Sequence, residues 1–344
     1  IVLGKDFKRP AVKSEIEKMS ELLDADMNAG AWGLSSGLEY DPGIYSNTEE
    51  VIALARIAAE KGGRYISHIR SEDRYFWKAV DEIIAIGEET GVAVQISHIK
   101  LALQRLLGKT DQLKAKLDKA RSEGIEISAD IYPYTYWQST MQVLFPERNF
   151  NDRSEAELVL SQITTPSGIM LTQFDPNPDY VGKTLQQISE MRNEDAPTTL
   201  LALIAETLDE NISESIIAES MTQDDIIELI KWDYTNICTD GGSDGGHPRG
   251  YGSYPRVLGK YVRENGWLNL EEAINKMTGL AAQNMNLKNR GVLKVGNYAD
   301  LVIFDPETII DRATPKNATA ISNGVESVFV NGKTVYSNNS TTHY

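Results

Sequence analysis

Apolar and amphipathic segments alternate regularly up to about residue 131, and this order restricts the fold more than any other feature of the chain. Apolar residues three and four positions apart predict helices, and short apolar runs bounded by glycine or polar residues predict strands. The predicted helices are Lys13–Ala29, Thr48–Lys61 (with Thr48 as its N-cap), Tyr75–Thr90 and Thr110–Ser122, and the predicted strands are Trp32–Ser36, Arg64–His68, Val92–His98 and Ile125–Ile131. Helices and strands in this order predict parallel βα units, whose crossovers bury both faces of a sheet.

The alternation stops near residue 136, and the stretch from about 136 to 220 is interpreted as an acidic insertion. The formal net charge is −16, and the segment Asp152–Glu228 holds sixteen acidic residues against three basic ones. Such acidity disfavours nucleic acid and anionic lipid as partners. No apolar run approaches the ~18 residues that can cross a bilayer. We therefore expect a small-molecule partner, with neither nucleic acid nor membrane.

Beyond the insertion the pattern ends in short strands, which predict a small β module. Thr222–Lys231 and Leu270–Met277 are predicted helices, and Asn236–Thr239 is a predicted strand that leads into Asp240. The strands predicted after Gly291 are Val292–Val295, Asp300–Phe304, Val325–Val330 and Lys333–Tyr336. Asn331-Gly332, between the last two, favours a two-residue hairpin turn.

Two of the four histidines, His68 and His98, end successive predicted strands. Reactive groups of parallel α/β folds gather at the carboxyl ends of strands, so we expect Asp240, at the end of a later strand, to belong with them. Imidazoles suit zinc, and a catalytic zinc keeps one position open for water. An aspartate could take a proton from that water and pass it to a leaving nitrogen. The alternatives are structural histidines and an aspartate that only begins a glycine turn.

Cationic residues accompany the same predicted strand ends. Lys100 shares a strand face with His98, and Arg70 shares one with His68. The further cations near these segments are Arg105, Lys109, Arg249 and Arg256. They predict a cationic site mouth that binds an anionic small molecule, such as a carboxylate. The alternative is a set of ordinary surface cations.

Hydroxyl groups and the single cysteine complete the set of candidate residues. The hydroxyls of Tyr132 and Ser139 could bind a carbonyl oxygen or a carboxylate, whereas packing beneath the insertion is the preferred interpretation of Tyr136 and Trp137. One cysteine excludes an intrachain disulfide and an all-cysteine metal cage. Cys238 is interpreted as a small core residue.

Several motifs together resemble the N-acyl-D-amino-acid deacylases, or D-aminoacylases, of the amidohydrolase superfamily. The motifs are Gly33-Leu34-Ser35-Ser36-Gly37-Leu38-Glu39-Tyr40, His68-Ile69-Arg70-Ser71-Glu72, Gln95-Ile96-Ser97-His98-Ile99-Lys100, Tyr132-Pro133-Tyr134, and Asp240-Gly241 followed by His247-Pro248-Arg249-Gly250-Tyr251-Gly252. Arg256-Val257-Leu258-Gly259 and Gly296-Asn297-Tyr298-Ala299-Asp300-Leu301-Val302 add to the resemblance, which extends from about residue 10 to 335.

The resemblance implies an α/β fold, a TIM-like metallo-dependent hydrolase (β/α)8 barrel of which strands four to eight are present, with a small C-terminal β-sandwich. The barrel would occupy residues 1–285, with the insertion at about 136–220, and the β-sandwich module residues 286–344.

The implied reaction is zinc-dependent hydrolysis of an N-acyl-D-amino acid to a D-amino acid and a carboxylate. By resemblance, His68 and His98 would bind zinc, and Asp240 would act as general base and then general acid. The positions that look like the family's substrate-binding residues are Lys100, Tyr132, Ser139, Arg249 and, more weakly, Tyr40.

The sequence departs from the family in its first part. The His-x-His pair of the superfamily's first barrel strand is absent, and no cysteine precedes Cys238 to match the family's early cysteine ligand. We therefore expect a fragment of a longer protein that lacks barrel strands one to three; the alternative is a naturally shortened relative of the family. The loop after Asp240 is also poorer in histidine than the family pattern. No signal peptide is visible, which slightly favours the cytoplasm, although a leader could lie in a missing N-terminal part.

Two alternative functions stay open. A chain without the first barrel strands could be a non-catalytic ligand-binding remnant, because an open sheet does not close a barrel. Another amidohydrolase, such as a cyclic amidase, is the second alternative, but its substrates lack the free carboxylate that Lys100 and Arg249 would bind. The oligomeric state is not predicted.

Overall fold

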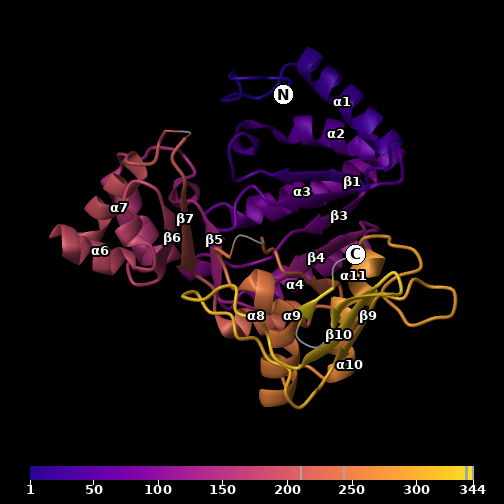
Figure 1. Ribbon diagram of the computed structural model, residues 1–344. Helices are drawn as coiled ribbons and strands as arrows, with labels where there is room; N and C mark the ends of the chain where they lie inside the picture. The colour runs from indigo at the N-terminus through magenta and orange to yellow at the C-terminus, as the bar shows by residue number, and fades with distance from the viewer. Residues whose placement is uncertain (210, 243–244, 338–339, 343–344) are drawn as a thin grey trace. The chain divides into compact units, whose positions relative to one another are not determined.

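The computed structural model describes residues 1–209, 211–242, 245–337 and 340–342 (Figure 1). The chain divides into two compact units, Ile1–Asp130 and Ile131–Tyr344. The domain boundary near residue 285 stays a prediction. None of the helices in the described ranges is long and apolar enough to cross a bilayer.

The first unit alternates helices and strands as the sequence predicts. Its elements are α1 (Lys13–Asn28), β1 (Gly33–Gly37), η1 (Gly43–Tyr45), α2 (Thr48–Glu60), β2 (Arg64–His68), α3 (Phe76–Thr90), β3 (Ala93–Ile96), η2 (Gln104–Leu106), α4 (Thr110–Ser122) and β4 (Ile127–Ile131). The predicted helices and strands are confirmed to within a few residues. The N-cap of α2, however, is Asn47 and not Thr48, because the Asn47 side chain accepts the Glu50 backbone N–H.

The strands pair in parallel in the order β1-β2-β3-β4. The register places Gly37 opposite His68, Ser67 opposite Ile96, and Ile96 opposite Ala129. The carboxyl ends of these strands therefore meet at one edge of the sheet. Residues that end or follow a strand, far apart in the sequence, become neighbours at that edge.

Helices cover this sheet with apolar faces, and α2 contacts both α1 and α3 (Figure 1). The buried residues of α3 include Phe76, Ala79, Val80 and Ile83, which recur three and four positions apart. This spacing places them on one face of a helix. Gly91 ends α3 in the left-handed region, at φ +69°.

The second unit holds the insertion and the C-terminal module. Its elements are β5 (Tyr136–Ser139), η3 (Met141–Leu144), α5 (Arg153–Leu158), η4 (Val159–Ile163), β6 (Ile169–Phe174), η5 (Pro178–Tyr180), α6 (Leu185–Arg192), α7 (Ala196–Ala205), β7 (Glu214–Glu219), α8 (Gln223–Ile230), β8 (Thr235–Ile237), α9 (Arg249–Arg256), η6 (Val257–Glu264), α10 (Leu270–Met277), α11 (Gly279–Asn284), β9 (Leu301–Phe304), β10 (Val325–Val330), β11 (Lys333–Ser337) and β12 (Ser340–Thr341).

The insertion forms a small antiparallel sheet in the order β5-β7-β6, beside α6 and α7 (Figure 1). The C-terminal module is an antiparallel sheet in the order β12-β11-β10-β9. Lys333 pairs with Val330 across the predicted Asn331-Gly332 turn. The predicted strand Val292–Val295 is wrong: none of these four residues belongs to a strand, and Val295 is fully exposed.

Candidate metal centre

His68 and His98 lie side by side at the carboxyl edge of the parallel sheet. His68 is the last residue of β2, and His98 follows β3 by two residues. His68 Nδ1 and His98 Nε2 are 3.0 Å apart, and the two residues are 7% and 9% exposed. The structure therefore brings these two predicted residues together.

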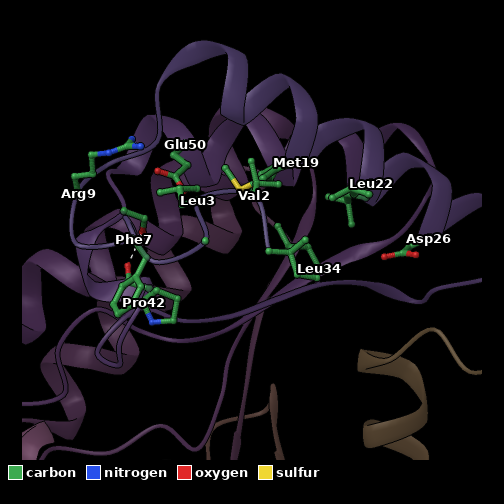
Figure 2. A pocket seen from close by; sticks show the side chains of 16 residues that line it. Val2, Leu3, Phe7, Arg9, Met19, Leu22, Asp26, Leu34, Pro42 and Glu50 are labelled. Atoms are coloured by element: carbon green, nitrogen blue, oxygen red, sulfur yellow. Dashed lines mark hydrogen bonds between the residues drawn. The ribbon is translucent and has the colours of Figure 1, made fainter. Parts of the chain in front are cut away.

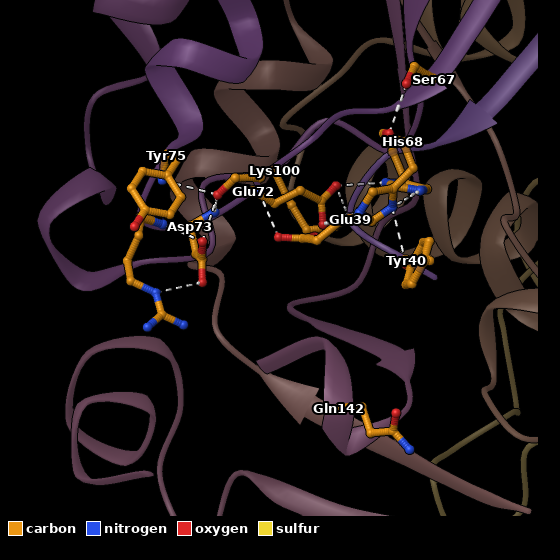
Figure 3. A network of polar contacts seen from close by, with 12 residues as sticks. Glu39, Tyr40, Ser67, His68, Glu72, Asp73, Tyr75, Lys100 and Gln142 are labelled. Atoms are coloured by element: carbon orange, nitrogen blue, oxygen red, sulfur yellow. Dashed lines mark hydrogen bonds and ion pairs between the residues drawn. The ribbon is translucent and has the colours of Figure 1, made fainter. Parts of the chain in front are cut away.

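Two buried glutamates complete the cluster (Figure 3). Glu39 Oε2, in the loop after β1, is 2.8 Å from His68 Nε2. Glu72 Oε1, in the loop after β2, is 3.0 Å from His98 Nδ1. One ligand atom from each of His68, Glu72 and His98 can be chosen so that all lie within 4.8 Å of one another. Imidazole and carboxylate ligands thus converge on a small buried volume.

Lys100 neutralises Glu72 inside the cluster. Its Nζ donates to both carboxylate oxygens of Glu72, at 2.6 and 2.7 Å, and lies 2.7 Å from His98 Nδ1. Burial by itself would raise the pKa of Glu72, but the interactions with His68 and Lys100 outweigh it, and the pKa falls well below its usual range. Glu72 is therefore ionised.

The same surroundings keep His98 neutral. Burial, followed by the charge of Lys100, lowers the pKa of His98 below its usual value. His98 Nδ1 lies within hydrogen-bond distance of both Lys100 Nζ, at 2.7 Å, and Glu72 Oε1, at 3.0 Å, while its Nε2 faces His68. A metal ligand must be neutral imidazole, and metal binding displaces the proton on the ligating nitrogen. Two imidazoles that face each other beside an ionised carboxylate fit a zinc ion.

Tyr40 lies against the cluster. Its hydroxyl is 3.2 Å from His68 Nδ1, and the two rings have centroids 4.4 Å apart. Arg70 does not join the cluster. It donates to Glu82 and to backbone carbonyls of η1 and the residue after it, so its charge is used to hold α3.

In the second unit, Asp240 and Arg249 form an ion pair. Arg249 Nη1 is 2.6 Å from Asp240 Oδ2, and the Arg249 side chain is 8% exposed whereas that of Asp240 is 34% exposed. The Arg249 guanidinium lies over the Tyr132 ring, 4.6 Å from its centroid. Arg249 Nε has no hydrogen-bond partner among the described residues. Three predicted site residues therefore adjoin one another.

His247 holds the backbone of Arg249 in place. Its Nδ1 accepts the Arg249 backbone N–H at 2.9 Å, and its Nε2 lies 3.0 Å from the Tyr136 carbonyl, to which it donates. Burial lowers the pKa of His247 well below its usual value. The ring is neutral in a single tautomer and lies among tyrosine rings, including Tyr134 at 5.5 Å between centroids.

Two further predicted residues of the second unit are Ser139 and Arg256. Ser139 ends β5, opposite Ile216 of β7, and is half-buried. Arg256 pairs with Asp311 and with the Pro133 carbonyl. Three of the cations expected at the site mouth, Lys100, Arg249 and Arg256, each have a carboxylate partner.

An apolar cavity of about 430 Å³ lies elsewhere in the first unit (Figure 2). It is lined by the start of the chain, by α1 and by Leu34 and Pro42. None of its lining residues belongs to the histidine cluster. It offers apolar packing surface and no metal-ligand set.

Sequence reasoning missed Glu39, Glu72 and Asp130 as members or supports of the cluster. All three are 8% exposed or less. Two signals were available: Glu72 follows His68 by four positions in a strand-end loop, and a buried lysine such as Lys100 needs a counter-charge. Nothing in the sequence indicated which carboxylate would supply it.

Comparisons with known proteins agree with this geometry. An amidohydrolase family model matches residues 235–336. The N-acyl-D-glutamate deacylase of Alcaligenes xylosoxydans xylosoxydans is 36% identical over 330 residues, which are 95% of this chain and 62% of that protein. The crystal structure of D-aminoacylase superposes with a TM-score of 0.87 at 32% identity, over 99% of this chain and 67% of that one.

A second solved structure is the N-acyl-D-glutamate deacylase from Bordetella bronchiseptica, complexed with zinc and a phosphonate inhibitor that mimics the tetrahedral intermediate. It matches with a TM-score of 0.85 and 34% identity, over 97% of this chain and 66% of that one. The chain thus spans less than two thirds of the length of the curated relative. With the amidohydrolase fold and the resemblance extending over almost all of its residues, the chain belongs to the D-aminoacylase family of amidohydrolases.

Proposed function

We propose that this chain takes part in zinc-dependent hydrolysis of the amide bond of N-acyl-D-amino acids. The observation that carries the proposal is the buried group of His68, Glu72 and His98, whose ligand atoms lie within 4.8 Å of one another. The relatives support the substrate class, because they are named for deacylation of N-acyl-D-amino acids. The zinc and phosphonate bound by the Bordetella enzyme support the metal and the reaction type.

In this proposal His68 and His98 hold the zinc, with Glu72 as a further candidate ligand. Zinc, when bound, supplies Lewis-acid chemistry to the amide carbonyl. Lys100 holds Glu72 in its ionised form through two short hydrogen bonds. Glu39 accepts from His68 and thereby fixes its ring, as carboxylates commonly do for metal-bound histidines.

Asp240 is the proposed general base and general acid. It takes one proton from the attacking water as oxygen bonds to the acyl carbon, and it returns that proton to nitrogen as the C–N bond breaks. The products are a carboxylate and a free amine. Arg249, over the Tyr132 ring, is the proposed partner of the substrate carboxylate, since a guanidinium binds carboxylates in a bidentate way. Tyr40, Lys100 and Ser139 remain proposed substrate contacts.

The test measures zinc content and hydrolysis together. We expect the purified chain to bind zinc, and we expect His98→Ala to lose it, because one of the two imidazoles is removed. His247→Asn is the matched control: it replaces a buried histidine outside the cluster and should leave zinc content unchanged. The zinc content of wild type and of both variants is measured by mass spectrometry after dialysis.

Activity is then assayed on N-acetyl-D-amino acids, their L-enantiomers and a hydantoin. We expect the D-series alone to be hydrolysed. Hydrolysis of the hydantoin in preference to the D-series would replace the proposal with a cyclic amidase. Equal zinc content in wild type and His98→Ala would refute the assigned metal site.

A further inference from the structure

Both carboxylate oxygens and the carbonyl oxygen of Asp130 accept hydrogen bonds from residues at or just after the end of β3. Its Oδ1 accepts the His98 backbone N–H at 2.7 Å, and its Oδ2 accepts from Gln95 Nε2 at 2.5 Å. Its own carbonyl oxygen accepts the Ile99 N–H at 2.8 Å. Asp130 is 8% exposed. One residue of β4 thus holds the backbone of two successive residues and a side chain of the neighbouring strand.

His98 needs such support, because its backbone is strained. It adopts φ +36°, a region that residues other than glycine seldom occupy. A strained backbone of this kind costs about 1–3 kcal/mol and persists only where the surrounding structure holds it. At this turn the His98 ring lies beside that of His68, with His98 Nε2 3.0 Å from His68 Nδ1.

A relay of buried hydrogen bonds leads to Asp130 from Arg64, at the start of β2. Arg64 Nη2 donates to Ser128 Oγ at 3.4 Å, Ser128 donates to Gln95 Oε1 at 3.1 Å, and Gln95 donates to Asp130. Every donor in the relay points toward the carboxylate. Arg64 is 5% exposed and lies at the other end of the relay, so a buried cation and a buried anion are joined across β2, β3 and β4.

We propose that Asp130 is a positioning residue for the metal centre: with Gln95 and Ser128 it forms a buried relay that holds the strained backbone of His98 and so presents its ring to the metal. This inference rests on the proposed zinc function. Asp130 touches neither substrate nor metal in this role. It acts through the His98 N–H, as groups beyond the direct ligands of a metal do when they orient those ligands.

The main experiment removes the negative charge of Asp130 and then places a carboxylate at its hydrogen-bond partner, Gln95. In Asp130→Asn the new amide N–H₂ faces the Gln95 amide N–H₂, so a donor meets a donor. The double variant Asp130→Asn/Gln95→Glu returns one carboxylate to the relay: the new amide at position 130 donates to the new carboxylate at position 95, and the bonds from Arg64 to Ser128 and from Ser128 to position 95 keep their direction. The control is Glu82→Gln, a carboxylate with a 9% exposed side chain in the same unit that pairs with Arg70.

Zinc affinity, measured by competition with a chromophoric chelator, is the first readout. Asp130→Asn should weaken zinc binding by about 10- to 100-fold, the usual range for loss of such supports. The double variant should recover most of that loss, and Glu82→Gln should bind zinc as wild type does. Unchanged affinity in Asp130→Asn, or an equal loss in Glu82→Gln, would overturn the inference.

The second readout requires no metal and separates this inference from the proposed function. Hydrogen exchange of the His98 amide should be roughly tenfold faster in metal-free Asp130→Asn, because its charged acceptor is lost. If wild type binds no zinc, the proposed function fails, while exchange that accelerates only at His98 and its neighbour still supports the positioning role. Exchange that accelerates equally throughout the unit, or not at all, refutes it.

Discussion

At the residue scale, several buried charges have specific partners among the described residues. Glu72 is paired with Lys100, Arg249 with the partly exposed Asp240, and Asp130 receives backbone and amide donors. Glu214 differs from them. Its Oε1 accepts the Met141 N–H at 2.6 Å, while its Oε2 has no hydrogen-bond partner among the described residues.

Glu214 therefore predicts a pH-dependent stability. Burial raises its pKa from 4.5 to about 7, so the folded chain retains a proton that the unfolded chain releases. The stability that this proton provides is complete below about pH 4.5 and is lost as the pH rises through about 7. Glu214→Gln should be more stable than wild type at pH 8.5 by ~1–3 kcal/mol, with the difference shrinking toward pH 5.

Urea denaturation at pH 5 and pH 8.5 measures this effect. Glu219→Gln is the control, because Glu219 ends the same strand and is exposed. That variant should match wild type at both pH values. A stabilisation by Glu214→Gln that is the same at both pH values would show that Glu214 is not the titrating group.

At the element scale, periodicity and glycine punctuation set the helices. The buried residues of α3 recur at helical spacing, and Gly91 stops the helix at φ +69°. The same reasoning was wrong for Val292–Val295. Apolar residues there lie between two glycines with positive φ, Gly291 and Gly296, and they form no strand. Apolar alternation in so short a stretch does not distinguish a strand from a loop.

The left-handed conformation of Gly91, which ends α3, predicts that a side chain at this position destabilises the fold. Gly91→Ala should destabilise the protein by about 1–2 kcal/mol, because a Cβ is unfavourable in the left-handed conformation. Asn193 ends α6 in the same conformation, at φ +54°. Asn193→Gly should change the free energy of unfolding by less than ~0.5 kcal/mol, since asparagine tolerates that region. Equal effects of the two substitutions, in thermal or urea unfolding, would contradict this account.

At the scale of the whole molecule, the metal centre depends on sheet formation. Glu39, His68, Glu72 and His98 come from the ends of three strands and the loops after them, and only the parallel register brings them together. An unfolded chain presents no such site. Zinc that binds the folded chain alone must therefore stabilise it.

We expect zinc to raise the midpoint of thermal unfolding. At a free zinc concentration of about 100 times the Kd, the gain is ~2.7 kcal/mol. His68→Ala should abolish the shift, whereas magnesium, which prefers oxygen ligands, should not reproduce it. Differential scanning calorimetry with and without zinc measures the shift. A zinc-induced shift that survives in His68→Ala would place the binding elsewhere.

Much of this protein follows from the sequence by itself. The alternation up to residue 131, the strand-end positions of His68 and His98, and the hairpin at Asn331-Gly332 depend on residues a few positions apart, so local periodicity reveals them. The resemblance of several motifs then indicated the family. These features needed no knowledge of which strand lies beside which.

Only the tertiary structure decided the partners. That Glu72 and not another carboxylate meets Lys100, that Glu39 fixes His68, and that Asp130 holds His98 all depend on strand register. A shift in register would change every such neighbour while leaving the sequence pattern intact. The helices and strands are thus determined by near neighbours in the chain, whereas the chemistry of the centre is determined by contacts between residues that the folded sheet brings together.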